Sequence, residues 1–82
     1  MKLVVNKPIF AETASALVNT ASQYHSTIMI KKEHWVVDAK SLLGVLALSL
    51  QPGQEVEISF EGETEQGFIE ALTESRNFSK AE

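Results

Sequence analysis

The sequence contains no cysteine. This absence excludes disulfide bridges, thiol nucleophiles and thiolate metal sites, and it fits a reducing compartment such as the cytoplasm. Long apolar runs are missing too, because the longest, Leu42 to Leu50, is interrupted by Gly44 and Ser49 and falls far short of the roughly 20 residues that a bilayer requires. The N-terminal residues have no apolar signal-peptide core. We therefore expect a cytoplasmic protein without a membrane segment.

Basic residues are also few: the sequence has seven Lys and Arg but eleven Asp and Glu, which gives a net charge of -4. Nucleic-acid phosphates require a basic face, so we expect no binding to DNA or RNA. Trp35 is accordingly assigned to the core or to a sheet face, and not to a base-stacking platform.

Candidate ligands and catalytic carboxylates are equally sparse. The two histidines, His25 and His34, have no neighbouring thiolate or carboxylate ligands, so the sequence predicts neither a metal site nor a cofactor. The glutamates between Glu61 and Glu74 are interpreted as a solvated surface and not as a catalytic carboxylate pair.

What the sequence does contain is an ordinary globular composition, with 44% hydrophobic and 22% charged residues. A chain of 82 residues with this composition is expected to fold as one domain, residues 1–82, around a thin core.

The order of apolar and polar residues predicts seven elements. Alternation and β-branched residues predict strands at 2–6, 26–31, 34–38 and 55–60, with the middle two forming a hairpin through Lys31-Lys32-Glu33. Helical spacing predicts a helix of about four turns from Ala11, a short helix after Ser41, and a third helix over 64–76 with Thr64 as its cap. Residues from Asn77 onward are expected to be frayed. This order indicates an α+β protein with a small antiparallel sheet and helices on one face.

Ser41 stands where the second helix should begin. Its side-chain oxygen can accept a hydrogen bond from an otherwise unpaired amide of the first turn. The free N–H groups and the macrodipole of a helix start also attract phosphate. The residues alone therefore leave two interpretations open: a plain N-cap and a phosphorylation site.

Three stretches carry a resemblance to a known family: Leu17-Val18-Asn19-Thr20-Ala21-Ser22-Gln23-Tyr24, Lys40-Ser41-Leu42-Leu43-Gly44-Val45, and the run from Gly53 through Glu55-Val56-Glu57-Ile58 to Gly62 and Ala71-Leu72. Together they resemble the HPr family, the small histidine-containing phosphocarriers of the bacterial sugar phosphotransferase system, and its regulatory relative Crh. The resemblance implies an HPr-like open-faced sandwich with the order βαββαβα. In that fold, a four-stranded antiparallel sheet is covered on one face by three helices.

The family's active-site motif, Gly-x-His-Ala-Arg-Pro, is not kept. The corresponding residues are Pro8-Ile9-Phe10-Ala11-Glu12-Thr13, so Phe10 stands in place of the phosphorylated histidine and Glu12 in place of the arginine. A phenyl ring has no lone pair with which to accept a phosphoryl group, and Glu12 would repel its charge. The resemblance therefore implies no catalytic residue at this position.

The resemblance implies the opposite for Ser41, because a dedicated kinase phosphorylates the corresponding serine in many Gram-positive members of the family. It also implies that Lys40, Leu42, Leu43 and Leu46 form a surface presented to that serine kinase and to a transcriptional regulator. Helical spacing cannot bury all three leucines, so we expect one or two of them to face outward.

The predicted function is that of a non-catalytic, protein-binding regulator of carbon metabolism, switched by phosphorylation of Ser41. One alternative is a phosphocarrier that uses His25 or His34, and another is a diverged scaffold with different partners. The expected assembly is a monomer or a weak homodimer.

Overall fold

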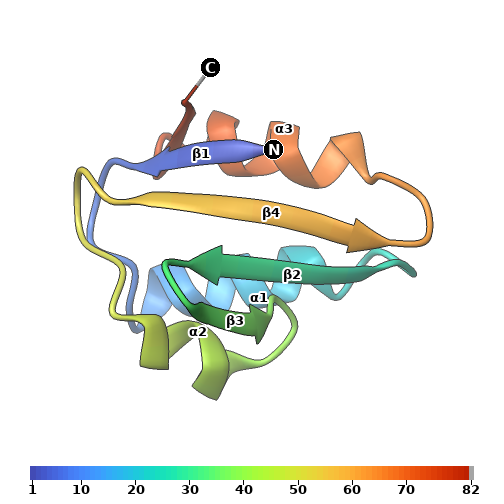
Figure 1. Cartoon of the computed structure of the whole chain (residues 1–82), viewed down its shortest axis with the longest axis horizontal. Coiled ribbons are helices and arrows are strands. Elements are labelled where there is room, and N and C mark those ends of the chain that lie inside the picture. The colour runs from blue at the N-terminus through green and yellow to red at the C-terminus, as the bar shows by residue number, and fades with distance from the viewer. Residues whose placement is uncertain (82) are drawn as a thin grey trace.

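The computed structural model describes residues 1–81 and contains five strands and three helices (Figure 1). The strands are β1 (Lys2–Val5), β2 (Thr27–Lys32), β3 (Trp35–Asp38), β4 (Glu55–Glu61) and β5 (Phe78–Lys80). The helices are α1 (Glu12–Ala21), α2 (Leu42–Leu48) and α3 (Gln66–Glu74). All strand pairs are antiparallel in the order β3-β2-β4-β1-β5, and the helices cover one face of this sheet (Figure 1). The predicted open-faced α+β architecture is confirmed.

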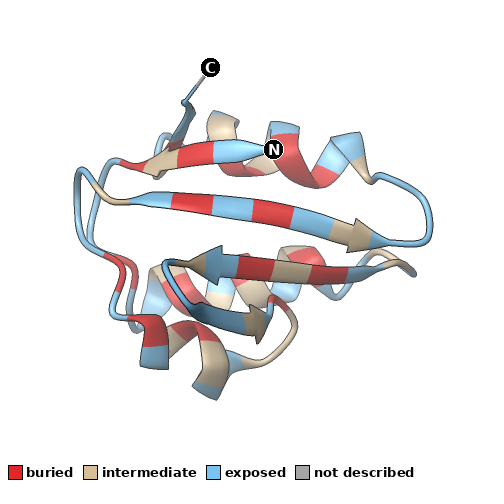
Figure 2. Ribbon diagram, viewed as in Figure 1, coloured by how far each residue is buried: buried red, intermediate tan, exposed pale blue. Residues whose placement is uncertain are grey.

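Alternation along the central strands builds the core (Figure 2). The side chains that face the helices are almost fully buried, and they belong to Leu3, Val5, Ile28, Ile30, Val56 and Ile58. Burial of these apolar side chains against the helices is the main force holding the two layers together. From the helical layer, Ala14 and Leu17 of α1 and Phe68 and Leu72 of α3 complete the core.

The sheet has one strand more than predicted. Residues 78–80, expected to be frayed, form β5 and pair with β1 in a register that places Phe78 opposite Val5 and Ser79 opposite Val4. Phe78 is 3% exposed, and the Asn6 side chain donates to Ser79 Oγ at 2.6 Å, so burial of one aromatic side chain and pairing with β1 hold this segment in place. Three residues are too few to show a strand period in the sequence.

The end of α1 also differs from the prediction, because the helix stops at Ala21 and residues 22–26 form turns and bends. Tyr24 packs edge-on against Phe68 of α3, with ring centroids 6.2 Å apart. Gly67 makes this approach possible, since a Cβ atom at that position would lie 2.8 Å from the Tyr24 hydroxyl.

Two smaller predictions are wrong. The hairpin turn consists of Glu33 and His34, one residue later than expected, because β2 extends to Lys32 and pairs it with Trp35. The N-cap of α3 is Glu65 and not Thr64, and no side-chain hydrogen bond caps the helix. Among the described residues, no helix is both long and apolar enough to cross a membrane.

Candidate functional site

The N-terminus of α2 is capped by Ser41, as predicted. Ser41 has an extended backbone, and its Oγ accepts a hydrogen bond from the amide of Gly44 at 3.2 Å. The Ser41 carbonyl accepts the first helical bond, from Val45 N at 3.0 Å. Its side chain is half-buried, so the hydroxyl is partly open to solvent while it holds the first turn.

The loop before α2 is tied to its surroundings on both sides. The Asp38 carboxylate accepts from the amide of Lys40 at 2.8 Å, and the Asp38 carbonyl accepts from the amide of Ser41 at 3.0 Å. The Lys40 ammonium donates to the carbonyl of Tyr24 at 2.7 Å, just beyond the end of α1. Lys40 therefore joins α1 to the start of α2, and its charge is less available to a partner than its sequence position suggests.

The leucines of α2 divide as helical spacing predicts. Leu43 is 80% exposed and Leu42 is 40% exposed, whereas Leu46 packs against the core. The helix lies so close to β3 that a Cβ atom on Gly44 would come within 3.1 Å of the Val37 side chain. This close contact orients α2 with Leu42 and Leu43 facing solvent.

The start of α1 places an aromatic side chain at the surface. Phe10 is 64% exposed, and its amide donates to Thr13 Oγ1 at 3.0 Å. Ala11, the N-cap, has φ 51° and ψ -116°, a conformation that non-glycine residues rarely adopt. Glu12, the first helical residue, is exposed and is the acidic residue of the first turn. This helix end therefore presents an apolar ring and a carboxylate.

Phe10 and Ser41 lie at opposite ends of α2. The amide of Ile9 donates to the carbonyl of Leu50 at 3.0 Å, which joins the start of α1 to the chain just after α2. Lys40 joins the other two ends, so the two helices run side by side in opposite directions. With seven residues, α2 is roughly 10 Å long, so one partner could contact both ends.

The two histidines lie elsewhere. His25 is exposed in the connection after α1, and His34 is exposed in the hairpin turn between β2 and β3. Within residues 1–81, no three His, Cys, Asp or Glu side chains gather where they could hold a metal ion, and no polar or charged side chain is fully buried. Trp35, expected in the core or on a sheet face, is 68% exposed on the edge strand β3.

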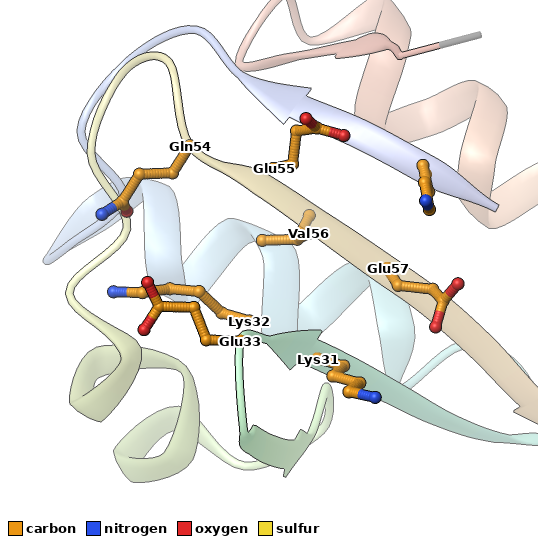
Figure 3. Close-up of a pocket in the computed structure, with 8 residues that line it drawn as sticks. Lys31, Lys32, Glu33, Gln54, Glu55, Val56 and Glu57 are labelled. Carbon is orange, nitrogen blue, oxygen red and sulfur yellow. The ribbon is translucent and has the colours of Figure 1, made fainter.

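A shallow hollow lies where β2 and β4 run side by side on the uncovered sheet face (Figure 3). Both signs of charge line it, from Lys2, Lys31, Lys32, Glu33, Glu55 and Glu57. In the close-up, the labelled side chains come from different strands and point in different directions. This hollow does not bring together the convergent groups that a small-molecule site requires.

Sequence reasoning missed one residue that positions the candidate site. The Lys32 ammonium donates to the carbonyl of Leu48, the last residue of α2, at 2.6 Å. A cation at a helix C-terminus satisfies a free carbonyl and complements the dipole. The sequence offers only a weak signal for this contact, because Lys32 lies in the charged run Lys31-Lys32-Glu33, which predicts a turn.

Comparison with known proteins shows the family of this chain. Residues 3–77 match the family model described as the PTS HPr component phosphorylation site. The chain belongs to the HPr family. The phosphocarrier protein HPr of Lysinibacillus sphaericus is 39% identical to it over 64 residues, which cover 78% of this chain and 73% of that relative.

Solved HPr-family structures match the fold as well. HPr from Bacillus anthracis superimposes with a TM-score of 0.79 and 30% identity, over 88% of each chain. Crh from Bacillus subtilis superimposes with a TM-score of 0.68 and 30% identity, over 85% of this chain and 78% of Crh, and its structure is described as a swapped, intertwined dimer. The chain is thus a protein of the sugar phosphotransferase system family, related both to phosphocarriers and to a catabolite-repression protein.

Proposed function

We propose that this protein is a non-catalytic, Crh-like member of the HPr family that acts in the cytoplasm by binding other proteins and is switched by phosphorylation of Ser41. The observation that carries the proposal is the contrast between the two ends of α2. Ser41 is half-exposed beside two outward-facing leucines, whereas Phe10 stands at the start of α1.

The start of α1 supports a loss of phosphoryl transfer. The nearest histidine in the sequence, His25, lies beyond the far end of α1 from Phe10. A phosphoryl relay also needs positive charge beside the transferred group, and Glu12 supplies a negative one. The sugar phosphotransferase relay would therefore find no acceptor at this helix end.

The start of α2 supports a switch. Phosphorylation replaces one hydroxyl by three acceptor oxygens and about two negative charges, next to the free amides of the first turn of α2. Leu42 and Leu43 follow directly and are exposed. The modified helix start would present a charged group and an apolar patch together, a surface suited to a regulator that carries a cationic pocket beside an apolar one.

The first experiment incubates the protein with an HPr serine kinase and ATP and measures incorporated phosphate by intact mass. We expect one phosphate on the wild type and none on Ser41→Ala. An unlabelled wild type, in a reaction where ordinary HPr is labelled, would eliminate the switch.

A second experiment tests the binding surface. Leu43→Gln should weaken binding of the phosphorylated protein to its regulator by about tenfold or more, the effect of removing a contact worth about 1.4 kcal/mol or more. Val36→Gln is the matched control, because Val36 is also exposed, at 53%, but lies on β3. Equal effects of the two variants would place the binding surface elsewhere.

Exposure to phosphoenolpyruvate and the first enzyme of the phosphotransferase system separates this proposal from the phosphocarrier alternative. Acid-labile phosphate on His25 or His34 would establish the alternative. If neither histidine acquires acid-labile phosphate and the kinase does not label Ser41, the remaining hypothesis is a diverged scaffold with other partners.

A further inference from the structure

The last part of β4 has a strand on one side only. On the side of β1, the pairing begins at Met1, which accepts from Ile58 N at 2.8 Å and donates to the Ile58 carbonyl at 3.0 Å. Beyond this point β4 continues to Glu61, paired with β2 but not with β1 (Figure 1). Within residues 1–81, no strand therefore occupies the space that lies in line with β1 and beside residues 59–61 of β4.

Phe60 directs its backbone groups toward this space. The backbone groups of successive strand residues point to alternate sides. Ile58 points toward β1, as its two bonds with Met1 show. Ser59 therefore points toward β2, and Phe60 again points away from β2. Among residues 1–81, no strand lies on that side to bond the N–H or the carbonyl of Phe60, so β4 presents there the donor and the acceptor that an added strand uses.

An open hollow of about 620 Å³ lies along the same part of β4. Its apolar lining comes from Met1, Ile58, Phe60 and Ile69, and its polar lining includes Thr64 and Gln66 near the start of α3. Ile58 and Ile69 are 1% and 0% exposed, so the floor of the hollow belongs to the packed core, while Phe60 is half-buried. A volume of this size, with an apolar floor and a few polar groups, is typical of a binding site.

The end of β4 carries a negative charge that no neighbouring strand balances. Glu57, earlier in the strand, lies opposite Lys2 of β1 and Lys31 of β2. Glu61 lies opposite Thr27 and is exposed. Opposite charges that face each other across two strands stabilise the pairing, so this position favours a basic residue on an added strand.

We propose that this hollow is a docking groove for an extended segment of another protein, which adds a short strand to β4 in line with β1. The segment runs antiparallel to β4, with an apolar residue opposite Phe60 and a basic residue opposite Glu61. The apolar residue exchanges both backbone bonds with Phe60, and its side chain faces the helical layer beside Ile69. The groove lies beside α3 and not beside α2, so its occupation does not depend on Ser41.

A short peptide tests the groove directly. The probe is acetyl-Thr-Lys-Leu-amide, in which Leu takes the place opposite Phe60 and Lys the place opposite Glu61. Titration should give saturable shifts in the amide NMR spectrum of the protein, with the Phe60 amide proton moving downfield as it forms a hydrogen bond. The same peptide with an N-methylated Leu is the matched control, because it keeps both side chains but has no N–H for the Phe60 carbonyl. Its dissociation constant should be about tenfold higher or more.

A substitution in the protein tests the charge at the end of β4. Glu61→Gln should raise the dissociation constant of the unmethylated peptide about threefold, as the loss of one exposed ion pair predicts. Glu74→Gln is the matched control, since Glu74 is also exposed but lies at the end of α3 that is far from the groove. The control should leave the dissociation constant unchanged.

Three results would overturn the proposal. One is a Phe60 amide that does not respond to the peptide. Another is equal binding of the N-methylated probe, which would mean that no strand is added to β4. The third comes from sedimentation equilibrium of the protein alone, where a dimer that the peptide dissociates would assign the groove to a second copy of this chain and not to a different protein.

Discussion

Ser41 and Gly44 show how single residues fix the start of α2, the candidate regulatory site. The Ser41 hydroxyl holds the amide of Gly44, and the missing side chain of Gly44 lets the helix approach Val37 of β3. An alanine at residue 44 would bring its Cβ atom within 3.3 Å of Ser41 Oγ. The same two residues therefore set the helix position and the surroundings of the candidate phosphorylation site.

Ala11 carries backbone strain at the start of α1. Its φ of 51° and ψ of -116° suit glycine, and such conformations cost other residues about 1–3 kcal/mol. Ala11→Gly would relieve this strain, while the greater freedom of glycine in the unfolded chain would offset about 0.5–1 kcal/mol of the gain. We expect the free energy of unfolding to rise by about 1 kcal/mol, measured by urea denaturation.

The matched control for this prediction is Ala16→Gly, at an exposed position inside α1. The same substitution there should lower the free energy of unfolding by about 1 kcal/mol, the usual cost of glycine in a helix. A loss of stability in both variants would show that Ala11 is not strained.

At the scale of elements, α2 is a short helix that lysine contacts tie at both ends to other segments. A helix of seven residues is unstable in isolation, so its position depends on tertiary contacts. The Lys40 ammonium reaches Tyr24 after α1, and the Lys32 ammonium at the end of β2 reaches the carbonyl of Leu48. These contacts keep the exposed leucines of α2 in one orientation.

Lys32→Met tests the contribution of the second contact. Methionine keeps the apolar stem but removes the charged donor at the C-terminus of α2, so we expect a loss of about 1–2 kcal/mol in unfolding free energy. Lys31→Met, on the exposed side of the same strand, should change it by less than about 0.5 kcal/mol. Equal losses in thermal or urea unfolding would refute a role for Lys32 as the cap of α2.

How far the elements could be predicted depended on how much apolar pattern each one carries. The alternating pattern in 55–60 identified β4, and the helical pattern that includes Leu17 and Ala21 identified α1, because each pattern covers enough residues to show its period. The cap at Ser41 was predictable because it is a local interaction. The strand β5 and the hydrogen bond from the Lys32 ammonium to the Leu48 carbonyl could not be predicted. Both depend on partners more than 15 residues away in the sequence.

At the scale of the whole molecule, the chain shares the fold of solved HPr-family structures, while the residues at the start of α1 lie at the surface. The antiparallel arrangement of α1 and α2 follows from the contacts at their two ends and not from the side chains at the surface. Phe10 and Glu12 are both exposed, so they can vary without disturbing the core. The proposed loss of a transfer site and the proposed regulatory role of Ser41 are therefore both compatible with one stable scaffold.

If the proposed loss of phosphoryl transfer rests on these two side chains, two surface substitutions should introduce a transfer site. Phe10→His supplies the imidazole nucleophile, and Glu12→Arg supplies the cation that neutralises the phosphoryl group. With phosphoenolpyruvate and the first enzyme of the phosphotransferase system, the double variant should acquire acid-labile phosphate. Phe10→His alone should react roughly a hundredfold more slowly, because a repelling carboxylate replaces a stabilising donor. If the double variant stays unlabelled while its fold and stability are unchanged, then the backbone around Ala11, and not the side chains alone, excludes phosphoryl transfer.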